Sequence, residues 1–513
     1  MVQTPALTFL LDTNVVIALE PFAGRMESLQ DPLARFVAMA LEHGHRIVVH
    51  PANRDDLLET ADEVHRKQNL AALHKYVQIS EVPLTAELEA AAGASAVGTN
   101  DWRDLRLLAA VVAGGATHLV TGDEKLIRRA GRAGVGEQAI TAEEALELLR
   151  QLHPSDPPTP PSVDTLAIAT LDLTQPIFES LRNDYEGFND WLRKAASQGK
   201  ARRTWVVRDT RGGYRAIAIV KTWDDHPIVP GAKATKLSTF KVDSESEGEK
   251  LGELLLKTVL MWAHETNVET LFVTVLNDEG KQPLIHFLGL FGFDNVGTLP
   301  NNPHELVLIK QFIPDPAKPL PPLEHHVAFG PPALEGSAEV FVIPIIPHWY
   351  EGLFPDAPSV GEFGQMTLGG LMAETQPFGN ALRKAYLSNA NIKGLPPGST
   401  VLFYRSAGIG GGGAVHAVGV VEKTMRSNDP AALMAFVGRR TVYTANQVAA
   451  MCEDDGGNHR EVLAVLFRQD RFVPQPWTLS QLLQNKVLRG VPQAITQVHS
   501  QEGVEWVYRQ LAE

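Results

Sequence analysis

The stretch Leu7-Thr-Phe-Leu-Leu-Asp-Thr-Asn-Val15 is an apolar run that is interrupted by an acid, Asp12. A second run of the same kind, Thr117-His-Leu-Val-Thr-Gly-Asp123, ends on Asp123. Buried parallel strands have continuous apolar sequences, and open α/β sheets place their sites beyond the carboxyl ends of the strands. We therefore predict two parallel strands whose terminal acids lie side by side at one edge of a sheet.

A third acid is expected beside this pair. A helix is predicted to begin at Asn100-Asp-Trp-Arg-Asp104 and to end at Gly114-Gly115, which places Asp104 near its first turn. Carboxylates crowded together repel one another unless a cation lies between them. Hard divalent ions such as Mg²⁺ and Mn²⁺ prefer oxygen ligands and promote phosphodiester cleavage. The pattern predicts a metal-dependent nuclease centre.

Length and composition limit the class of protein. The chain has 513 residues, which is too many for one core and indicates several domains. Hydrophobic residues make up 44% and charged residues 21%, as in ordinary soluble proteins. Cys452 is the only cysteine, which excludes an internal disulfide framework and favours a reducing cytoplasm. The net charge of −14 argues against a protein that coats nucleic acid with its whole surface. We expect neither a signal peptide nor a membrane span.

Two proline-rich stretches divide the chain. They predict linkers at residues 153–163 and 313–337, and hence domains at 1–152, 164–312 and 338–513. The first domain alternates strands and helices, including one long helix expected at Leu57–Tyr76, and this order predicts a parallel sheet. The expected fold class is α/β multidomain.

The first 150 residues resemble the PIN-domain family of metal-dependent ribonucleases. The resemblance lies in Leu-Leu-Asp12-Thr-Asn14, Asn100-Asp-Trp-Arg-Asp104-Leu-Arg-Leu-Leu and Leu-Val-Thr-Gly-Asp123. It implies an α/β/α fold with catalytic, metal-binding acids at Asp12, Asp104, Asp123 and Asp56, with Asp55 as the alternative to Asp56. Asp101 is an additional candidate ligand, and Asn14 and Thr121 would support the acids by hydrogen bonds. Two other interpretations remain open: Asp12 and Asp123 cap helices, or the domain is a degenerate PIN fold that only binds partners.

The middle of the chain resembles the GNAT family of acyl-CoA N-acyltransferases. Expected strands at Ala234–Val242 and Thr270–Leu276 flank the loop and helix that begin Glu247-Gly-Glu-Lys-Leu-Gly252, and the closing motif is Phe291-Gly-Phe293. The resemblance implies an α+β mixed sheet that binds acetyl-CoA. The residues it assigns to the cofactor are Phe240, Val242, Gly248, Glu249, Lys250, Leu251, Gly252, Glu253 and Asn277.

Three residues depart from the GNAT pattern. Glu247 stands where a basic residue is common, Lys250 replaces the middle glycine, and Leu288 replaces a tyrosine that often acts as general acid. These departures favour the hypothesis that the protein is a non-enzymatic regulator that senses RNA or a ligand.

The C-terminal region resembles the ASCH and EVE branch of PUA-like domains. The segments that carry this are Pro-Gly398-Ser-Thr-Val-Leu-Phe-Tyr-Arg405 and Gly490-Val-Pro-Gln493, after a helix expected at Asn380–Asn389. The resemblance implies a small β-barrel that binds RNA. The residues assigned to nucleic acid are Arg383, Lys384, Tyr404 and Arg405, although aromatic residues here also suit a barrel core.

Together these patterns predict one RNA-directed protein. The first hypothesis is a Mg²⁺- or Mn²⁺-dependent endoribonuclease, acting as a toxin or as an RNA-processing or stress factor, with an acetyl-CoA-binding domain and an RNA-binding domain. The second makes N-acetyl transfer to an RNA-linked or protein amine the main activity, with the other domains choosing the target. Expected partners are RNA, with tRNA as one candidate, acetyl-CoA, and a regulatory or antitoxin protein.

Overall fold

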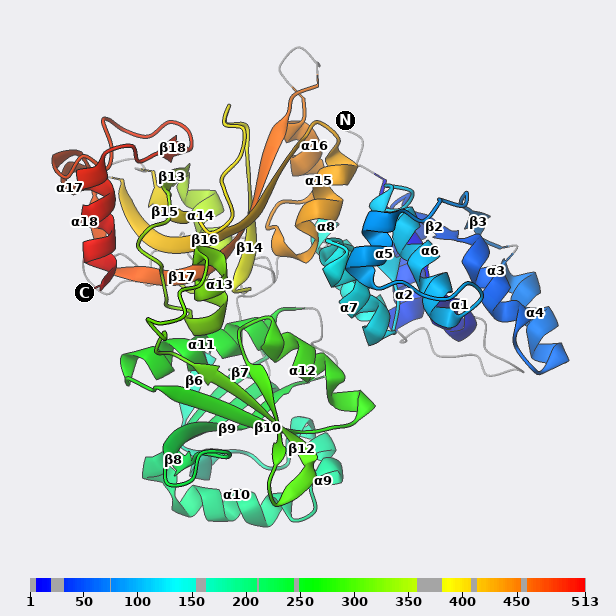
Figure 1. Cartoon of the computed structure of the whole chain (residues 1–513), viewed down its shortest axis with the longest axis horizontal. Coiled ribbons are helices and arrows are strands. Elements are labelled where there is room, and N and C mark those ends of the chain that lie inside the picture. Colours follow the sequence, from blue (N-terminus) through cyan, green and yellow to red (C-terminus); the bar gives the residue numbers. More distant parts are fainter. Residues whose placement is uncertain are drawn as a thin grey trace. The chain divides into compact units, whose positions relative to one another are not determined.

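The structure is a computed structural model that describes residues 6–19, 32–73, 75–153, 163–209, 212–243, 249–357, 381–406, 413–453 and 459–512. Within these ranges, parallel and mixed sheets are combined with helices, which confirms the α/β class (Figure 1). The described residues divide into two compact units. One contains residues up to 156 with 387–389 and 425–464, and the other contains the remainder. The three-domain plan stays a prediction.

The N-terminal sheet is parallel, with strand order β3-β2-β1-β4-β5. Its strands are β1 (Thr8–Leu11), β2 (Arg46–Val49), β3 (Val77–Gln78), β4 (His118–Val120) and β5 (Ala139–Ile140). The helices of this region are α1 (Thr13–Leu19), α2 (Pro32–Glu42), α3 (Pro51–Leu58), α4 (Glu63–Leu73), α5 (Ala86–Ala92), α6 (Asn100–Val112), α7 (Glu124–Arg132) and α8 (Ala142–Leu152). The central strands β1 and β4 are buried, as their apolar sequences predict.

Side-chain caps fix where several of these helices begin. Thr99 accepts the amide of Trp102 at the start of α6, and Thr141 forms a capping box with Glu144 at the start of α8. The single long helix expected at Leu57–Tyr76 is wrong, because α3 ends at Leu58 and α4 begins at Glu63. The two helices are separated by Glu59-Thr-Ala-Asp62, and Asp is a residue that favours helix starts over helix interiors.

The central sheet is mixed and has the strand order β11-β12-β10-β9-β8-β7-β6. Its strands are β6 (Val163–Leu166), β7 (Arg202–Arg208), β8 (Tyr214–Asp225), β9 (Lys233–Val242), β10 (Thr270–Leu276), β11 (Asp294–Leu299) and β12 (Asn302–Gln311). The helices are α9 (Glu179–Asp184), α10 (Phe188–Ser197), α11 (Leu251–Glu265) and α12 (Gln282–Gly289). All pairings are antiparallel except the one between β9 and β10.

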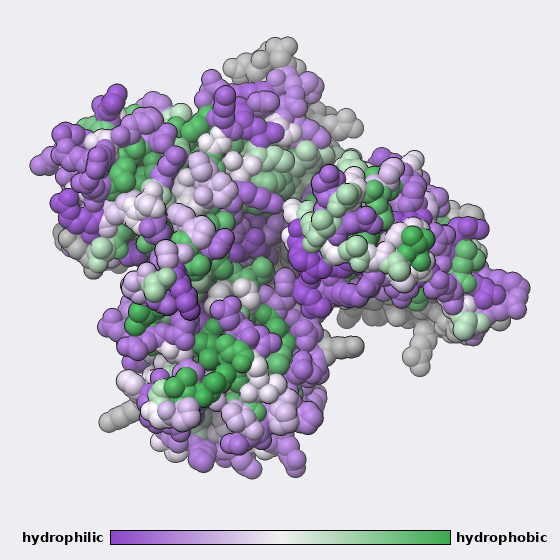
Figure 2. Space-filling view, viewed as in Figure 1, coloured by the Kyte–Doolittle hydropathy of each residue, from purple (hydrophilic) through white to green (hydrophobic). Residues whose placement is uncertain are grey.

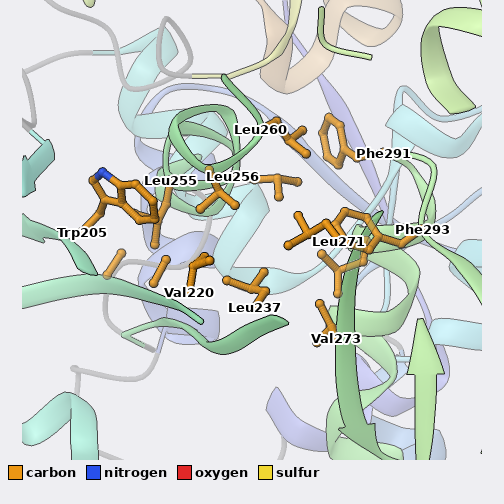
Figure 3. Packing of buried hydrophobic residues seen from close by; sticks show 14 of the residues in the cluster. Trp205, Val220, Leu237, Leu255, Leu256, Leu260, Leu271, Val273, Phe291 and Phe293 are labelled. Atoms are coloured by element: carbon orange, nitrogen blue, oxygen red, sulfur yellow. The ribbon is translucent and has the colours of Figure 1, made fainter. Parts of the chain in front are cut away.

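Alternating residues of β7 and β8 send side chains into two cores. Trp205 and Val220 face α11 in the cluster shown in Figure 3, whereas Val206 and Ile217 pack against the α9–α10 side. Because strand side chains alternate between faces, this pattern sandwiches the sheet between helices, α11 on one face and α9 and α10 on the other (Figure 1).

The third sheet has the order β14-β17-β16-β15-β13-β18. Its strands are β13 (Val340–Ile345), β14 (Arg383–Ser388), β15 (Thr400–Arg405), β16 (Ala414–Ser427), β17 (Val462–Thr478) and β18 (Thr496–Gln497). The nearby helices are α14 (Pro347–Leu353), α15 (Pro430–Val437), α16 (Ala445–Met451), α17 (Leu479–Gln484) and α18 (Gln501–Ala512). The helix expected at 380–389 is wrong: residues 383–388 form a strand, because pairing within the sheet outweighs the helix propensity of Ala, Leu, Arg and Lys.

The two expected linkers differ in how much the structure says of them. Residues 154–162 lie outside the described ranges. The segment 313–337 contains a helix, α13 (Pro322–Phe329), that the sequence did not predict. Lys310 on β12 is buried and donates from its ammonium to the carbonyls of Phe291, Val327 and Ala328. Val327 and Ala328 belong to this segment, which is therefore fastened to the central sheet by two of these hydrogen bonds.

Hydrophilic side chains cover most of the face shown in Figure 2, and apolar side chains appear there in separate patches. Of the helices in the described residues, none combines the length and the apolar character needed to cross a membrane.

Candidate active site

The pairing of β1 with β4 brings Asp12 and Asp123 to the same edge of the sheet. Leu11 pairs with Val120 in a parallel register, so the residues that follow both strands leave the sheet together. The amide of Asp12 donates to the carbonyl of Val120 at 3.0 Å. Asp123 follows three residues after Val120 and precedes α7. The carboxyl ends of the strands thus meet as the sequence predicts.

Asp12 is held by two hydrogen bonds at its carboxylate. Thr121 donates its hydroxyl to Asp12 Oδ2 at 2.6 Å, and the amide of Thr13 donates to Asp12 Oδ1 at 2.7 Å. Thr121 also accepts the amide of Asp123 at 2.9 Å, and Asn14 accepts the amide of Gly122 at 3.5 Å. Thr121 therefore bonds the carboxylate of Asp12 directly, whereas the bond from Asn14 is to the main chain of Gly122, next to Asp123.

Burial sets the charge of Asp12. Its side chain is buried, and this desolvation raises its pKa to about 6 even though the hydrogen bonds from Thr121 and Thr13 oppose the shift. The carboxylates of Asp123 and Asp56 raise the pKa of Asp12 further. Asp12 therefore sits within the electrostatic reach of two other acids.

Asp104 lies on α6 and joins the same cluster. Desolvation raises its pKa to about 7, and the charges of Asp12 and Asp123 add to the increase. Arg129 Nη1 lies 3.5 Å from Asp104 Oδ2 and lowers the pKa, but by less than these effects raise it. Asp12, Asp104 and Asp123 thus form a mutually repelling set, the acidic cluster.

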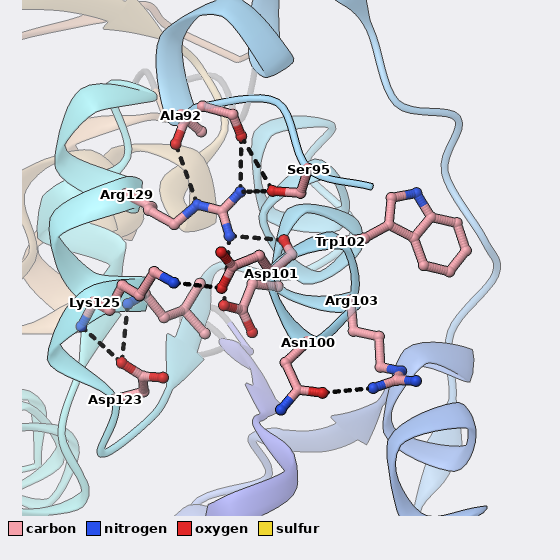
Figure 4. A network of polar contacts seen from close by, with 12 residues as sticks. Ala92, Ser95, Asn100, Asp101, Trp102, Arg103, Asp123, Lys125 and Arg129 are labelled. Atoms are coloured by element: carbon pink, nitrogen blue, oxygen red, sulfur yellow. Dashed lines mark hydrogen bonds and ion pairs between the residues drawn. The ribbon is translucent and has the colours of Figure 1, made fainter. Parts of the chain in front are cut away.

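Arg129 is committed mainly to main-chain carbonyls. It donates to the carbonyls of Ala92, Gly93 and Asp101 at 2.7 to 3.1 Å, all shorter than its contact with Asp104 (Figure 4). Its side chain is 3% exposed, and it fastens α7, on which it lies, to the end of α5 and the start of α6. Arg129 therefore holds the end of α5 in place beside the acidic cluster. Its weaker contact with Asp104 does not cancel the raised pKa of that acid.

Asp123 has a second role at the start of α7. Its Oδ1 accepts the amides of Lys125 at 2.7 Å and Leu126 at 3.2 Å, which is an N-cap (Figure 4). The interpretation of Asp123 as a helix cap is therefore correct, and it holds together with membership of the acidic cluster. Asp12 stands directly before α1, and its carbonyl accepts the amides of Val15 and Val16.

The remaining predicted acids are engaged in ion pairs. Asp56 lies 3.4 Å from Arg103, and Asp55 lies 2.6 Å from Arg106. Asp101 is bound by Lys125 at 2.5 Å, which lowers its pKa. Only Asp56 of these three acts on the pKa of Asp12, whereas Asp101 raises that of Asp104 weakly. The influence of Asp56 on Asp12 agrees with Asp56 rather than Asp55 as the fourth acid, and the choice stays a prediction.

Among the described residues, no group of three or more His, Cys, Asp or Glu side chains is arranged closely enough to hold a metal ion as it stands. The donor set nevertheless suits a hard cation, because Asp12, Asp104 and Asp123 offer carboxylate oxygens, and burial and neighbouring acids raise the pKa of Asp12 and Asp104. A bound cation would remove that repulsion. The three carboxylates fit such an ion in chemistry, although their side chains would have to move closer to it.

In the central region, β9 and β10 diverge. They pair in parallel only at Leu271 with Thr235 and Phe272 with Lys236, although β9 continues to Val242 and β10 to Leu276. Asn277 follows the end of β10, is exposed, and donates its amide to the carbonyl of His304. The two strands are therefore paired over a short stretch and separate toward their carboxyl ends.

The start of α11 lies beside the end of β9. Lys250 adopts a left-handed conformation with φ of 61°, and Leu251 and Gly252 begin the helix. A Cβ built on Gly252 would lie 3.6 Å from Phe287 and from Val242, which is ordinary contact. Phe240 stacks on Phe287 with ring centroids 6.0 Å apart. Gly248 lies outside the described residues.

Acids at the start of α11 are used in contacts that the sequence did not predict. Glu249 pairs with Arg215, and Glu253 lies 3.6 Å from Lys250. The buried Glu253 Oε2 also accepts the amides of Leu382 and Arg383, at 2.9 and 3.1 Å. The first turn of α11 therefore binds the beginning of β14, a contact that no local sequence pattern reveals.

The four residues predicted to bind RNA in the C-terminal region make contacts within the protein. Tyr404 is 1% exposed and belongs to an apolar core, so it cannot stack on a base in this structure. Lys384 is buried with its ammonium 5.5 Å from the ring centre of Phe354. Arg383 pairs with Glu422 at 2.8 Å and Arg405 with Glu351 at 3.0 Å. Tyr404 and Lys384 are therefore shielded from a nucleic acid, and the roles predicted for Arg383 and Arg405 stay predictions.

Comparison with known proteins adds little. The chain matches no family model, and no curated protein shows significant similarity to it. An acetyltransferase of the GNAT family from Staphylococcus aureus Mu50 is 12% identical, covering 29% of this chain and 99% of that one, with a TM-score of 0.24. ASCH from Zymomonas mobilis is 14% identical, covering 34% of this chain and 93% of that one, with a TM-score of 0.24. At these TM-scores neither similarity assigns a fold or a function to this chain.

Proposed function

We propose that the N-terminal region is a divalent-cation-dependent nuclease that cleaves RNA. The observation that supports this proposal is the acidic cluster, in which Asp12, Asp104 and Asp123 repel one another at the carboxyl ends of β1 and β4. Holding three carboxylates together opposes stability unless a cation is bound there. RNA as the substrate rests on the resemblance of the acid-bearing segments to PIN domains.

The residues of the acidic cluster and its neighbours would have separate roles in cleavage. A bound Mg²⁺ or Mn²⁺ supplies a Lewis acid that polarises a phosphodiester and lowers the pKa of water. Asp12, Asp104 and Asp123 would hold it, and Asp56 would complete the acidic set. Thr121 keeps Asp12 oriented through its 2.6 Å hydrogen bond, and Arg129 on α7 holds the end of α5 through its hydrogen bond to Ala92.

RNA cleavage by the full-length protein tests the proposal. With Mn²⁺ present, Asp12→Asn and Asp123→Asn should each lower cleavage by more than about 100-fold, more than the loss of a neighbour of a metal ligand usually costs. Glu87→Gln, an exposed acid in the first turn of α5, is the control and should cleave like the wild type. Cleavage that persists in both aspartate variants would contradict the proposal, as would cleavage that is unchanged by removing divalent cations.

A second candidate function is acyl-CoA binding by the central region, supported by the separation of β9 from β10 beside the N-terminus of α11. The backbone fits a diphosphate, because amides at the start of α11 have no partner within the helix. The charges fit it less well, since Glu249 and Glu253 stand in the same turn. If acyl-CoA binds, the amides of Lys250 to Gly252 would hold its diphosphate and the chain would position the thioester for attack by an amine.

Calorimetry with acetyl-CoA tests this second candidate. Glu249→Gln removes an anion from the helix N-terminus and releases Arg215 from its ion pair, so it should tighten binding about two- to fivefold. Glu265→Gln, at the opposite end of α11, is the matched control and should leave the affinity unchanged. Absence of binding in both the wild type and Glu249→Gln would exclude acetyl-CoA as a ligand.

A further inference from the structure

Asn53 is a buried amide beside the acidic cluster that no sequence pattern singled out. It lies on α3 and is 0% exposed. Its Nδ2 donates to the carbonyl of Leu11 at 3.0 Å and to the hydroxyl of Thr13 at 3.2 Å. Its Oδ1 accepts the amide of His50 at 2.7 Å. The two donors and the acceptor of the side chain are therefore all used.

These hydrogen bonds enclose Asp12. Leu11 precedes Asp12 and Thr13 follows it, so Asn53 fixes the chain on both sides of the acid. The same helix carries Asp56 three residues later, and residues at this spacing share a helix face. Asp56 is one of the charges that act on Asp12. Asn53 is thus a direct connection between the chain on both sides of Asp12 and the helix that carries Asp56.

We propose that Asn53 is a positioning residue that sets the spacing of the acids from the α3 side. The inference rests on the proposed nuclease function. Thr121 acts on the carboxylate of Asp12 itself from the β4 side, whereas Asn53 acts on the main chain of β1. An amide is required at this position, because only a group that donates and accepts at once satisfies Leu11, Thr13 and His50 together.

This requirement distinguishes Asn53→Asp from a conservative change. An aspartate has the same shape, but it would place an acceptor against the carbonyl of Leu11 and add a negative charge beside the acidic cluster. Asn53→Ala removes the same bonds without that charge. We therefore expect Asn53→Asp to impair cation binding more than Asn53→Ala does.

Mn²⁺ titration of the full-length protein, followed by electron paramagnetic resonance and by RNA cleavage, tests the inference. Asn53→Asp should weaken Mn²⁺ binding by about 10- to 100-fold, the usual range for residues that orient metal ligands. Thr13→Val removes only one acceptor and should weaken it less, whereas Thr13→Ser keeps the hydroxyl and should bind like the wild type. Arg54→Ala, an exposed position on α3, is the control.

Two results would overturn the inference. If Asn53→Ala and Thr13→Val bind Mn²⁺ like the wild type and only their melting temperatures fall, Asn53 merely stabilises the fold. If the wild type binds no Mn²⁺, the proposed function fails, and amide hydrogen exchange of Asp12 and Thr13 decides about Asn53. Exchange that is faster in Asn53→Ala than in Arg54→Ala supports positioning, and equal exchange contradicts it. Should Asn53→Asp fail to fold, the Thr13 pair carries the test.

Discussion

Burial makes Asp104 a source of instability in the cation-free protein. Its pKa of about 7 in the folded state lies above the ordinary value of 3.8, so the folded protein retains a proton there that the unfolded chain has lost. Between about pH 4 and pH 7 the folded state binds more protons, and its stability therefore falls as the pH rises through that window. At pH 8 the full repulsion within the acidic cluster is present.

Asp104→Asn should consequently stabilise the cation-free protein at pH 8. The expected gain is about 1 to 2 kcal/mol, reduced from the full value of the pKa shift because the side chain keeps some contact with water. At pH 4 the gain should disappear, since Asp104 is then protonated in the wild type. Urea unfolding at both pH values measures the difference, and an equal loss of stability at both would show that Asp104 makes favourable contacts instead.

Gly292, in the Phe291-Gly-Phe293 motif, is required by a close approach to α13. Its φ is +78°, and a Cβ built on it would lie 2.0 Å from the carbonyl of Val327. Gly292→Ala should therefore destabilise the protein by about 3 kcal/mol or more, through backbone strain and displacement of α13. Gly289→Ala, at the end of α12 with open space around it, is the control and should be neutral or slightly stabilising. Thermal unfolding compares them; equal effects would contradict the close approach.

At the scale of elements, a histidine pair joins the turn between α2 and β2 to the end of α8. His45 Nδ1 accepts the amide of Leu7 at 3.0 Å, so a neutral His45 carries its proton on Nε2 and donates it to His153 Nε2 at 2.8 Å. His43 stacks on His153 with ring centroids 3.9 Å apart. Desolvation, and in addition the neighbouring imidazoles, lower the pKa of both His45 and His153 to about 4.

This pair should make stability depend on pH in the acidic range. The unfolded chain takes up protons below about pH 6.5, whereas the folded chain does so only near pH 4, so stability is lost as the pH falls from 6.5 to 4. His153→Gln removes one titrating group and should reduce that loss by about 1 kcal/mol or more. Unfolding measured from pH 4 to 7 is the test. A wild type and variant with parallel pH profiles would contradict the assigned pKa shift.

The elements that local sequence predicts well are those whose signal is contained in one segment. The apolar runs predict β1 and β4, the segment that begins at Asn100 predicts α6, and these elements bring Asp12, Asp104 and Asp123 together. β14 was mistaken for a helix because its partners, β17 and the carboxylate of Glu253, are distant in sequence. Arg129 and Asn53 were missed for the same reason, since they bind carbonyls on other elements.

At the scale of the whole molecule, the proline-rich segment 313–337 shows what composition cannot predict. Prolines suggested a linker, yet α13 within it packs against the buried ammonium of Lys310 on β12. Composition does not reveal that one buried lysine side chain donates hydrogen bonds to three main-chain carbonyls. Likewise, the compact units include residues 425–464 together with the N-terminal region, a grouping that chain order alone does not suggest.

The central claim is that the carboxylates of Asp12, Asp104 and Asp123 together bind a hard divalent cation. Crystals of the full-length protein grown with Mn²⁺ test it through anomalous diffraction at the manganese edge. We predict a peak about 2.1 Å from carboxylate oxygens of Asp12, Asp104 and Asp123, and its loss in Asp12→Asn. An empty cluster at saturating Mn²⁺, with Arg129 moved in to neutralise Asp104, would contradict the account.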